Sequence, residues 1–279
     1  MMIDAHHHLW KYNPEEYGWM DDSMSVLKRD YLPANLEPEL EKARVKGTVV
    51  VQARQCLEET RWLLEQAEAN PFIKGVVGWV DLRSPDLESQ LEEFATHPKM
   101  VGVRHVVHDE ADDEFMLQAG FMKGIARLEE YKLVFDLLLF PKHLVYASEL
   151  VNAFPRQRFV LDHLGKPLIK AGQMEPWKTD IEQVAANTNV WCKISGMVTE
   201  ACHDHWEIND FIPYMEVVKN SFGPERIMLG SDWPVCKLAG GYEEVMNIPL
   251  IFSRHMKANE QERVLRMNAI ECYQLQTES

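Results

Sequence analysis

The sequence predicts an α/β fold in which eight parallel strands alternate with helices and close into one barrel. Three observations predict it: eight short apolar, β-rich runs recur, helix-like stretches separate them, and no linker, repeat or low-complexity tract divides the 279 residues. The eight runs are 3–6, 48–52, 75–80, 101–106, 133–138, 158–161, 190–194 and 226–230. Barrels of this kind reach about 250 residues as one domain. We therefore expect a single-domain (β/α)8 TIM barrel over residues 1–279.

The stretches between the runs have the spacing and the end signals of helices. Residues 59–67 and 86–94 carry apolar side chains at intervals of three and four, and Pro141 stands where the helix after the fifth run would begin. Gly47, Gly75 and Gly223 precede strands and are expected to end helices. A doubly wound open sheet is the competing fold, but no G-x-G-x-x-G follows the first strand to support it.

Composition excludes several classes of function. The formal net charge is −15, which argues against nucleic acids and anionic membrane surfaces as partners. No apolar run approaches the roughly 20 residues of a membrane span, and no signal segment precedes the first strand. Five cysteines, an odd number, fit free thiols in the cytoplasm better than a disulfide framework. The sequence does not indicate an oligomeric state.

Histidines and a carboxylate stand at the predicted strand exits. Because strand side chains alternate, His6 and His8 point to one side and His7 to the other. His163 follows the sixth run and Asp232 follows the eighth. In such barrels the working residues lie at the carboxyl ends of the strands, so these four side chains are expected to meet.

This set of residues suggests hydrolytic chemistry. Asp232 is ionised at neutral pH and can take a proton from water as a general base. His6, His8 and His163 can either hold a divalent cation or donate hydrogen bonds to a carbonyl, and both arrangements stabilise an oxyanion. Arg104, in the fourth run, can orient a carboxylate or a hydroxyl-rich substrate. Its alternative role is a buried ion pair, for which Asp81 and Asp136 are the candidate partners.

Five motifs in order resemble the amidohydrolase superfamily. They are Asp4-x-His6-x-His8, Val-Gly-Val-Arg-His at 101–105, Leu-Asp-His-Leu-Gly-Lys-Pro at 161–167, Lys-Ile-Ser-Gly at 193–196 and Gly-Ser-Asp-Trp-Pro at 230–234. They most resemble its sugar-lactonase branch, which includes fuconolactonase- and rhamnonolactonase-like proteins and is related to 2-pyrone-4,6-dicarboxylate lactonase. The resemblance extends from residue 2 to Asn268-Ala269.

The resemblance implies a (β/α)8 barrel that hydrolyses a sugar lactone to a hydroxy acid. It carries Asp232 over as the base, with the three histidines as metal ligands or carbonyl polarisers and Arg104 as a substrate-orienting residue. Relatives with two metals carry a Lys or Glu and a further His on middle strands, whereas the fifth run here has neither His nor Lys. We therefore expect at most one divalent ion, zinc by preference, held by His6, His8, His163 and Asp232. The branch also includes metal-independent relatives.

Further residues near strand exits are candidate substrate contacts. Trp19, followed by Met20 in a long loop, is expected in a lid, and the other candidates are Gln52, Trp79, Lys193 and Trp233. Strand alternation alone does not establish whether Lys193 faces inward. The segment Cys202-His203-Asp204-His205 lacks a second ligand pair and is expected to be a polar loop, and Cys236 a free thiol without a paired base.

The sequence thus predicts a hydrolase that opens a sugar-derived aldonolactone of the L-fucono-, L-rhamnono- or L-galactono- type. Asp232 activates water while the histidines polarise the ester carbonyl, with or without one cation. One alternative is a metal-dependent decarboxylase on the same scaffold. A second is a non-catalytic barrel that binds a sugar acid.

Overall fold

A computed structural model describes residues 2–276 of the chain and contains one sheet of eight parallel strands. The strands pair in sequence order, and their bounds are β1 Met2–His7, β2 Val45–Val51, β3 Ile73–Gly78, β4 Met100–His105, β5 Val134–Leu137, β6 Phe159–Leu161, β7 Val190–Ile194 and β8 Ile227–Leu229. A parallel bridge between His7 and Trp233 joins the last strand exit to the first. The predicted (β/α)8 barrel is confirmed, and all eight predicted runs form strands.

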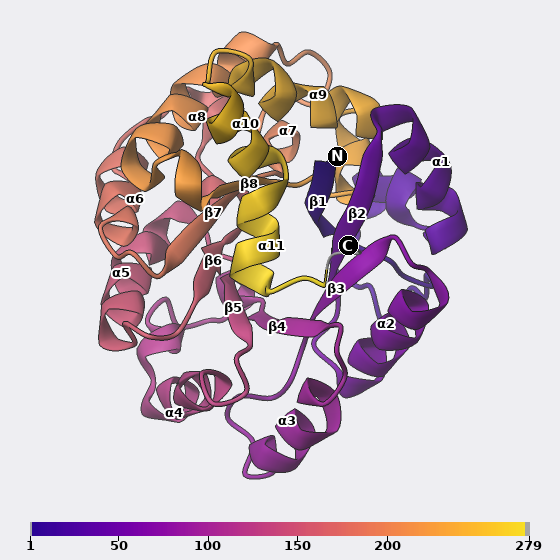
Figure 1. Cartoon of the computed structure of the whole chain (residues 1–279), viewed down its shortest axis with the longest axis vertical. Coiled ribbons are helices and arrows are strands. Elements are labelled where there is room, and N and C mark those ends of the chain that lie inside the picture. Colours follow the sequence, from indigo (N-terminus) through magenta and orange to yellow (C-terminus); the bar gives the residue numbers. More distant parts are fainter. Residues whose placement is uncertain (1, 277–279) are drawn as a thin grey trace.

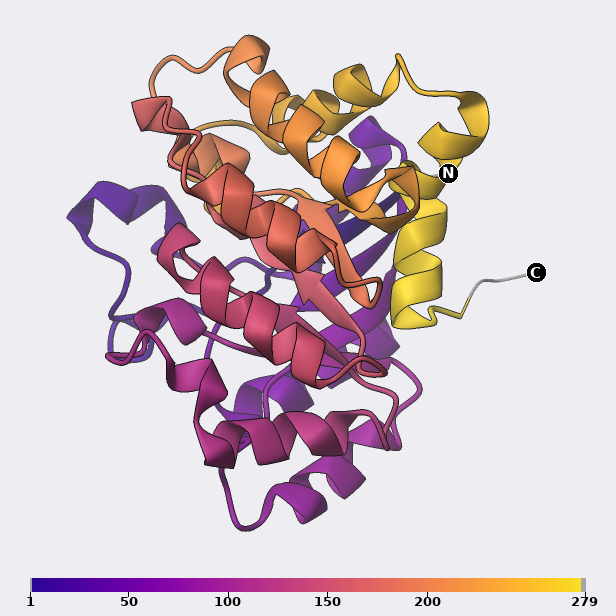
Figure 2. The same ribbon diagram turned by 90° about the vertical axis from the view of Figure 1, so that its left-hand side faces the viewer.

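Helices surround the barrel as an outer ring, except that α11 crosses one end of it (Figures 1 and 2). Their bounds are α1 Pro33–Ala43, α2 Leu57–Ala69, α3 Leu87–Ala95, α4 Ala119–Leu128, α5 Leu144–Ala153, α6 Trp177–Ala185, α7 Met197–Glu200, α8 Ile208–Phe222, α9 Tyr242–Ser253, α10 Ala258–Glu262 and α11 Asn268–Tyr273. Pro141 opens a short 3-10 turn directly ahead of α5, where its fixed φ suits a first turn. None of the described helices is long and apolar enough to span a membrane.

Two of the three predicted glycine stops are wrong. Gly47 and Gly75 lie inside β2 and β3, whereas Gly223 follows α8 with φ +69°. The helix ahead of β2 ends instead at Arg44, which itself adopts the left-handed conformation. Gly75 is needed for space, because a Cβ there would lie 2.8 Å from Val101 and 2.9 Å from Leu275.

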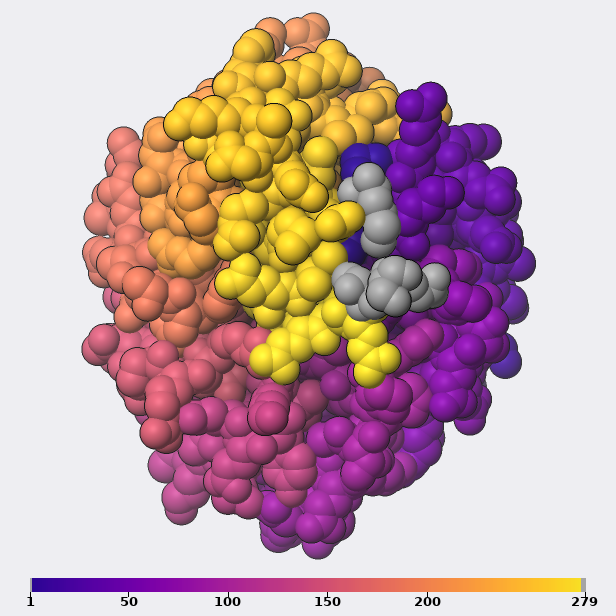
Figure 3. Space-filling view, in the orientation of Figure 1, coloured from indigo at the N-terminus to yellow at the C-terminus, as the bar shows by residue number. Residues whose placement is uncertain are grey.

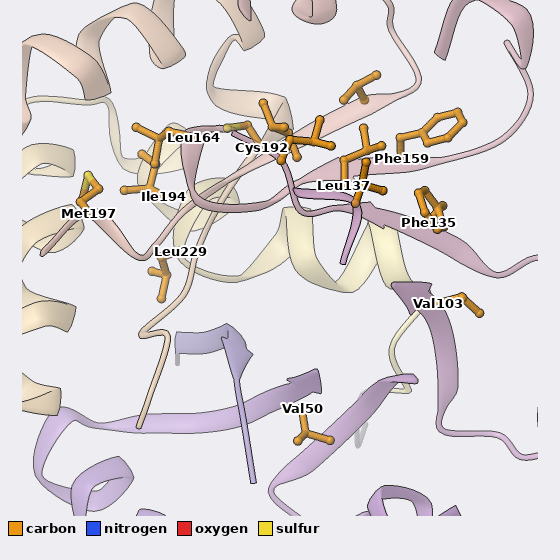
Figure 4. Packing of buried hydrophobic residues seen from close by; sticks show 14 of the residues in the cluster. Val50, Val103, Phe135, Leu137, Phe159, Leu164, Cys192, Ile194, Met197 and Leu229 are labelled. Atoms are coloured by element: carbon orange, nitrogen blue, oxygen red, sulfur yellow. The ribbon is translucent and has the colours of Figure 1, made fainter. Parts of the chain in front are cut away.

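Alternate strand residues divide the core into an inner and an outer part. Outward residues such as Val50, Val103 and Phe135 pack beneath the helices (Figure 4). Inward residues such as Val51, Val134 and Met228 fill the barrel together with residues of α11. This alternation matches the two-residue period of a strand, and both faces are buried, as expected for a parallel sheet.

The helix α11 closes one end of the barrel. Its residues Ala269, Cys272 and Tyr273, with Leu275 beyond it, pack against the inner residues of the strands. In the space-filling view the C-terminal segment covers the centre of this face (Figure 3). Functional groups are thereby left to the opposite end, where the carboxyl ends of the strands lie.

Candidate active site

Three imidazoles and one carboxylate meet at the carboxyl ends of β1, β6 and β8. The Nε2 atoms of His6 and His8 are 3.2 Å apart. Asp232 Oδ1 lies 3.4 Å from Nε2 of His8, 3.8 Å from that of His6 and 4.0 Å from that of His163. All four residues are buried. The chain thus brings together the four residues that the sequence analysis placed at one mouth of the barrel.

Tight backbone turns aim two of these side chains inward. His163 and Asp232 both adopt the left-handed conformation, with φ of +54° and +56°, directly after their strands. Such φ values are uncommon for residues other than glycine and persist only where the surroundings enforce them. Asp232 is held because its amide donates to the carbonyl of His6 at 2.8 Å and its own carbonyl accepts from Cys236 at 2.9 Å.

Hydrogen bonds behind the rings fix their orientation. His8 Nδ1 lies 2.8 Å from the carbonyl oxygen of Val51, which can only accept, so Nδ1 carries the proton and Nε2 presents a lone pair to the centre. His163 Nδ1 lies 2.9 Å from Ser195 Oγ. Such outer partners determine which ring nitrogen can act as a ligand, donor or acceptor.

The environment favours an ionised Asp232 carboxylate and neutral rings at His6 and His163. Burial alone would raise the pKa of Asp232, but its interactions with His163, His8 and His6 hold that pKa well below its ordinary value. Burial lowers the pKa of His163 to about 4, although Asp232 opposes the shift. Burial also places the pKa of His6 well below its ordinary value. The Asp232 carboxylate is therefore ionised near neutral pH.

Four buried charges lie around His6. Lys193 Nζ is 2.6 Å from Asp136 Oδ2 and 3.0 Å from Asp162 Oδ1, and all three side chains are fully buried. Arg104 donates from Nη1 to Asp162 Oδ2 at 3.1 Å. The ion-pair partner of Arg104 is therefore Asp162, and neither Asp81 nor Asp136 takes that place. Asp136 is instead paired with Lys193, which reaches it across the barrel interior.

The remaining candidate contacts occupy different environments. Gln52 is fully buried and accepts from Arg104 through both its backbone oxygen, at 2.5 Å, and its side-chain oxygen, at 3.3 Å. Trp233 is buried edge-on against Tyr31. Trp79 is half-buried and directs Nε1 at His105, at 3.4 Å. Trp19 is 43% exposed on the loop that follows β1, so it is the candidate most open to solvent.

The secondary cysteine candidates do not form a second centre. Cys202 Sγ contacts His205 Nδ1 at 3.4 Å in an irregular segment between α7 and α8, as the polar-loop interpretation expects. Cys236 is buried beside the site as a free thiol, and burial raises its pKa well above the ordinary value. A raised thiol pKa opposes a nucleophilic role.

The sequence analysis did not predict the supporting roles of several residues around the site. These are Asp162 and Asp136, the Ser195 hydroxyl behind His163, and Asp4, whose carboxylate accepts from Ser231 Oγ at 2.6 Å and from Tyr242 at 3.0 Å. A signal existed for one pair, because Asp136 and Lys193 are single opposite charges within otherwise apolar strands. A buried charge in such a strand needs a partner, and the two strands are next but one in the barrel.

The donor set fits one divalent cation by its spacing. Tetrahedral zinc with bonds of about 2.0–2.1 Å separates its ligand atoms by about 3.4 Å. The Nε2 atoms of His6 and His8 and Oδ1 of Asp232 are separated by 3.2–3.8 Å and form one group of possible ligands, whereas His163, whose Nε2 is 4.0 Å from that oxygen, lies outside this group. Nitrogen and carboxylate donors in this number suit zinc.

Comparison with known proteins places the chain in a family. The model of the amidohydrolase family matches residues 3–275. The chain belongs to the amidohydrolase family. A relative from Burkholderia ambifaria named L-fucono-1,5-lactonase is 38% identical over 240 residues, which cover 86% of this chain and 82% of the relative. A second protein of that name, from Burkholderia multivorans, is 35% identical over 289 residues, which cover 99% and 96%.

The fold of a solved amidohydrolase agrees closely with this one. A crystal structure of an amidohydrolase from Burkholderia multivorans, with bound zinc, superposes with a TM-score of 0.94 at 35% identity. The match covers 99% of this chain and 100% of the other. The family assignment therefore extends over the whole barrel, including all eight strands and the strand exits that carry the site.

Proposed function

We propose that this amidohydrolase opens the lactone ring of a sugar-derived aldonolactone of the L-fucono-, L-rhamnono- or L-galactono- type. As a lactonase it is a carboxylic ester hydrolase. The observation that carries the proposal is the ionised Asp232 carboxylate, buried at the barrel mouth with three imidazoles within 4.0 Å of it. The two relatives named L-fucono-1,5-lactonase support a sugar lactone as the substrate class.

The reaction begins with general-base activation of water by Asp232. The carboxylate takes one proton from water as the water oxygen bonds to the ester carbonyl carbon, and the carbonyl oxygen becomes an oxyanion. His6 and His163 polarise that carbonyl and stabilise the developing charge, whereas His8 presents only a lone pair to the centre. As the intermediate collapses, the bond to the ring oxygen breaks, and Asp232 returns its proton to that oxygen. The product is the open hydroxy acid.

Substrate orientation falls to the residues around this centre. Arg104 carries Nε without a partner in the described part of the chain and lies 3% exposed beside His6, so we assign it the orientation of the substrate's polar edge. Gln52 holds its guanidinium in place. Trp79 and Trp19 supply apolar surface at the mouth, and buried Trp233 supports the β8 exit from behind.

A divalent cation, zinc by preference, would be held by His6, His8, His163 and Asp232. When bound, it would polarise the carbonyl and lower the pKa of a bound water.

The five cysteines form no disulfide within the described residues, which accords with a reducing compartment such as the cytoplasm. The partner we assign is a small-molecule lactone alone.

A panel of lactones assayed by base consumption tests the proposal. Each turnover releases one acid, so titration at constant pH measures hydrolysis directly. We expect turnover with at least one six-carbon sugar or deoxysugar lactone, and none with its open acid. The decarboxylase alternative predicts release of carbon dioxide from an aromatic or unsaturated acid, and no acid formation from any lactone.

A further inference from the structure

His108 is a mostly buried imidazole at the barrel mouth that makes no hydrogen bond within the described part of the chain. It stands in the 3-10 turn Val107–Asp109, which follows β4, and its side chain is 15% exposed. Nδ1 is buried without a partner, and Asp109 Oδ1, 3.3 Å from Nε2, lacks hydrogen-bond alignment. Buried polar groups nearly always find a partner, so an unpaired imidazole at this place requires an explanation.

The next histidine along the chain shows that this part of the barrel can satisfy a buried ring. His143 Nδ1 accepts from the amide of Phe140 at 3.1 Å, and its Nε2 lies 3.3 Å from Asp113 Oδ1. Both nitrogens are thus paired although the side chain is fully buried. Asp113 therefore supports His143, and His143 in turn holds the backbone of Phe140 beyond the end of β5.

Phe140 fixes the orientation of His108 by packing. The two rings stack with their centroids 4.5 Å apart and their planes 14° from parallel. Phe140 covers one face of the imidazole and offers it no acceptor or donor. Since Nδ1 is buried, Nε2 is the ring nitrogen that remains accessible at the mouth. The ring is therefore held in place while its accessible nitrogen is left without a protein partner among the described residues.

The groups around His108 belong to the proposed centre. Burial lowers the pKa of the ring to about 3, and nearby Lys166, Arg104 and His163 add to the shift. Arg104 lies near the end of β4 and His163 directly after β6, so His108 is on the side of the mouth formed by β4 to β6. A neutral imidazole has one N–H donor and one bare acceptor nitrogen. It suits a hydroxyl, which can donate or accept, better than a carboxylate, for which a cation is the stronger partner.

We propose that His108 binds a ring hydroxyl of the sugar lactone through Nε2, and so helps to determine which lactone the enzyme accepts. The proposal deepens the proposed function and rests on it for the substrate class. Arg104 and the centre would hold the reacting end of the lactone, and His108 would contact the part that carries the hydroxyl groups. His108 takes no part in making or breaking the ester bond.

His108→Phe, assayed against a series of lactones that each lack one hydroxyl, tests the proposal. Phenylalanine keeps a flat ring against Phe140 and removes both nitrogens. For the fully hydroxylated parent lactone we expect kcat/KM to fall about 10- to 100-fold, the scale of leaving a buried polar group unpaired. For the analogue that lacks the contacted hydroxyl, kcat/KM of His108→Phe should equal that of the wild type.

The series separates loss of one contact from general damage to the site. An unchanged kcat/KM for the parent lactone would overturn the proposal. Equal losses for every member of the series would overturn it as well, because no single hydroxyl would then depend on His108. His255→Phe, at an exposed turn between α9 and α10, is the matched control and should leave every value unchanged.

Two further measurements keep the proposal distinct from the proposed function and from a structural role. If the wild type hydrolyses no lactone, the proposed function itself fails; hydrolysis by the wild type without an effect of His108→Phe overturns only the role of His108. The urea midpoint of His108→Phe should not fall below that of the wild type, because the variant removes a buried polar atom that has no partner among the described residues. A lower midpoint would show that the imidazole supports the fold and would contradict the proposal.

Discussion

Gly196 allows His163 to occupy its place in the site, so replacing this glycine should displace a proposed catalytic residue. Gly196 follows β7 with φ +62°, and a Cβ added there would lie 2.5 Å from His163 Nδ1 and 2.8 Å from its Cγ. An ordinary contact is at least 3.4 Å, so the imidazole must retreat by about 0.9 Å. The movement would also break the 2.9 Å contact between His163 and Ser195.

The expected effect of Gly196→Ala has two parts. The left-handed backbone costs an alanine about 1–2 kcal/mol of folding stability. A catalytic group misplaced by about 1 Å costs about 10²-fold in rate, equivalent to about 2.7 kcal/mol of transition-state stabilisation. We therefore expect kcat/KM for the lactone to fall about 100-fold while the protein remains folded.

Gly172→Ala is the matched control for this prediction. Gly172 has φ +61° but nothing lies within 4 Å of the position of its Cβ, so it carries the backbone cost without the collision. Both variants should lose similar stability in urea unfolding, apart from the strain of the collision, whereas only Gly196→Ala should lose activity. Equal kcat/KM in the two variants would refute the placement of His163 in the catalytic centre.

Two further predictions concern stability. Ser231→Ala removes the 2.6 Å hydrogen bond to the buried Asp4 carboxylate and should lower the free energy of unfolding by about 1.5–3 kcal/mol; a change below about 0.5 kcal/mol would contradict that role. Burial, with Lys166 and Arg104 nearby, lowers the pKa of His108 to about 3. From pH 6.5 towards 3 the unfolded state binds a proton that the folded state does not, so stability falls on acidification, by up to about 1.4 kcal/mol per pH unit. His108→Gln should reduce the slope of unfolding free energy between pH 7 and 5, and an unchanged slope would refute the assignment.

Much of the fold was predictable because the pattern of apolar residues along the chain indicates where strands and helices form. All eight strands were found from short apolar runs, since a strand buried on both faces must be apolar along its length. The helix ends were less predictable. Gly47 and Gly75 resemble helix stops in sequence, yet they serve close packing between strands, which depends on neighbours that are distant in sequence.

The central residues of the site were predictable from the sequence, whereas their hydrogen-bond partners were not. The sequence indicated His6, His8, His163 and Asp232 because each stands where a predicted strand ends, and parallel strands in a barrel share one carboxyl edge. Their hydrogen-bond partners were not predictable, because the carbonyl of Val51 carries no sequence signal. Arg104 shows the limit most clearly: spacing suggested two acidic partners, and the barrel interior supplied a third, Asp162.

The most direct test of the account is the turnover of a lactone by Asp232→Asn. Asparagine keeps the shape of the side chain but cannot accept the proton from water, so kcat should fall by about 10²–10⁴-fold. Asp204→Asn, at an exposed loop position, is the control and should retain wild-type activity. Base consumption at constant pH measures the lactonase activity of both variants. Activity of Asp232→Asn near that of the wild type would contradict the hydrolytic centre proposed for this barrel.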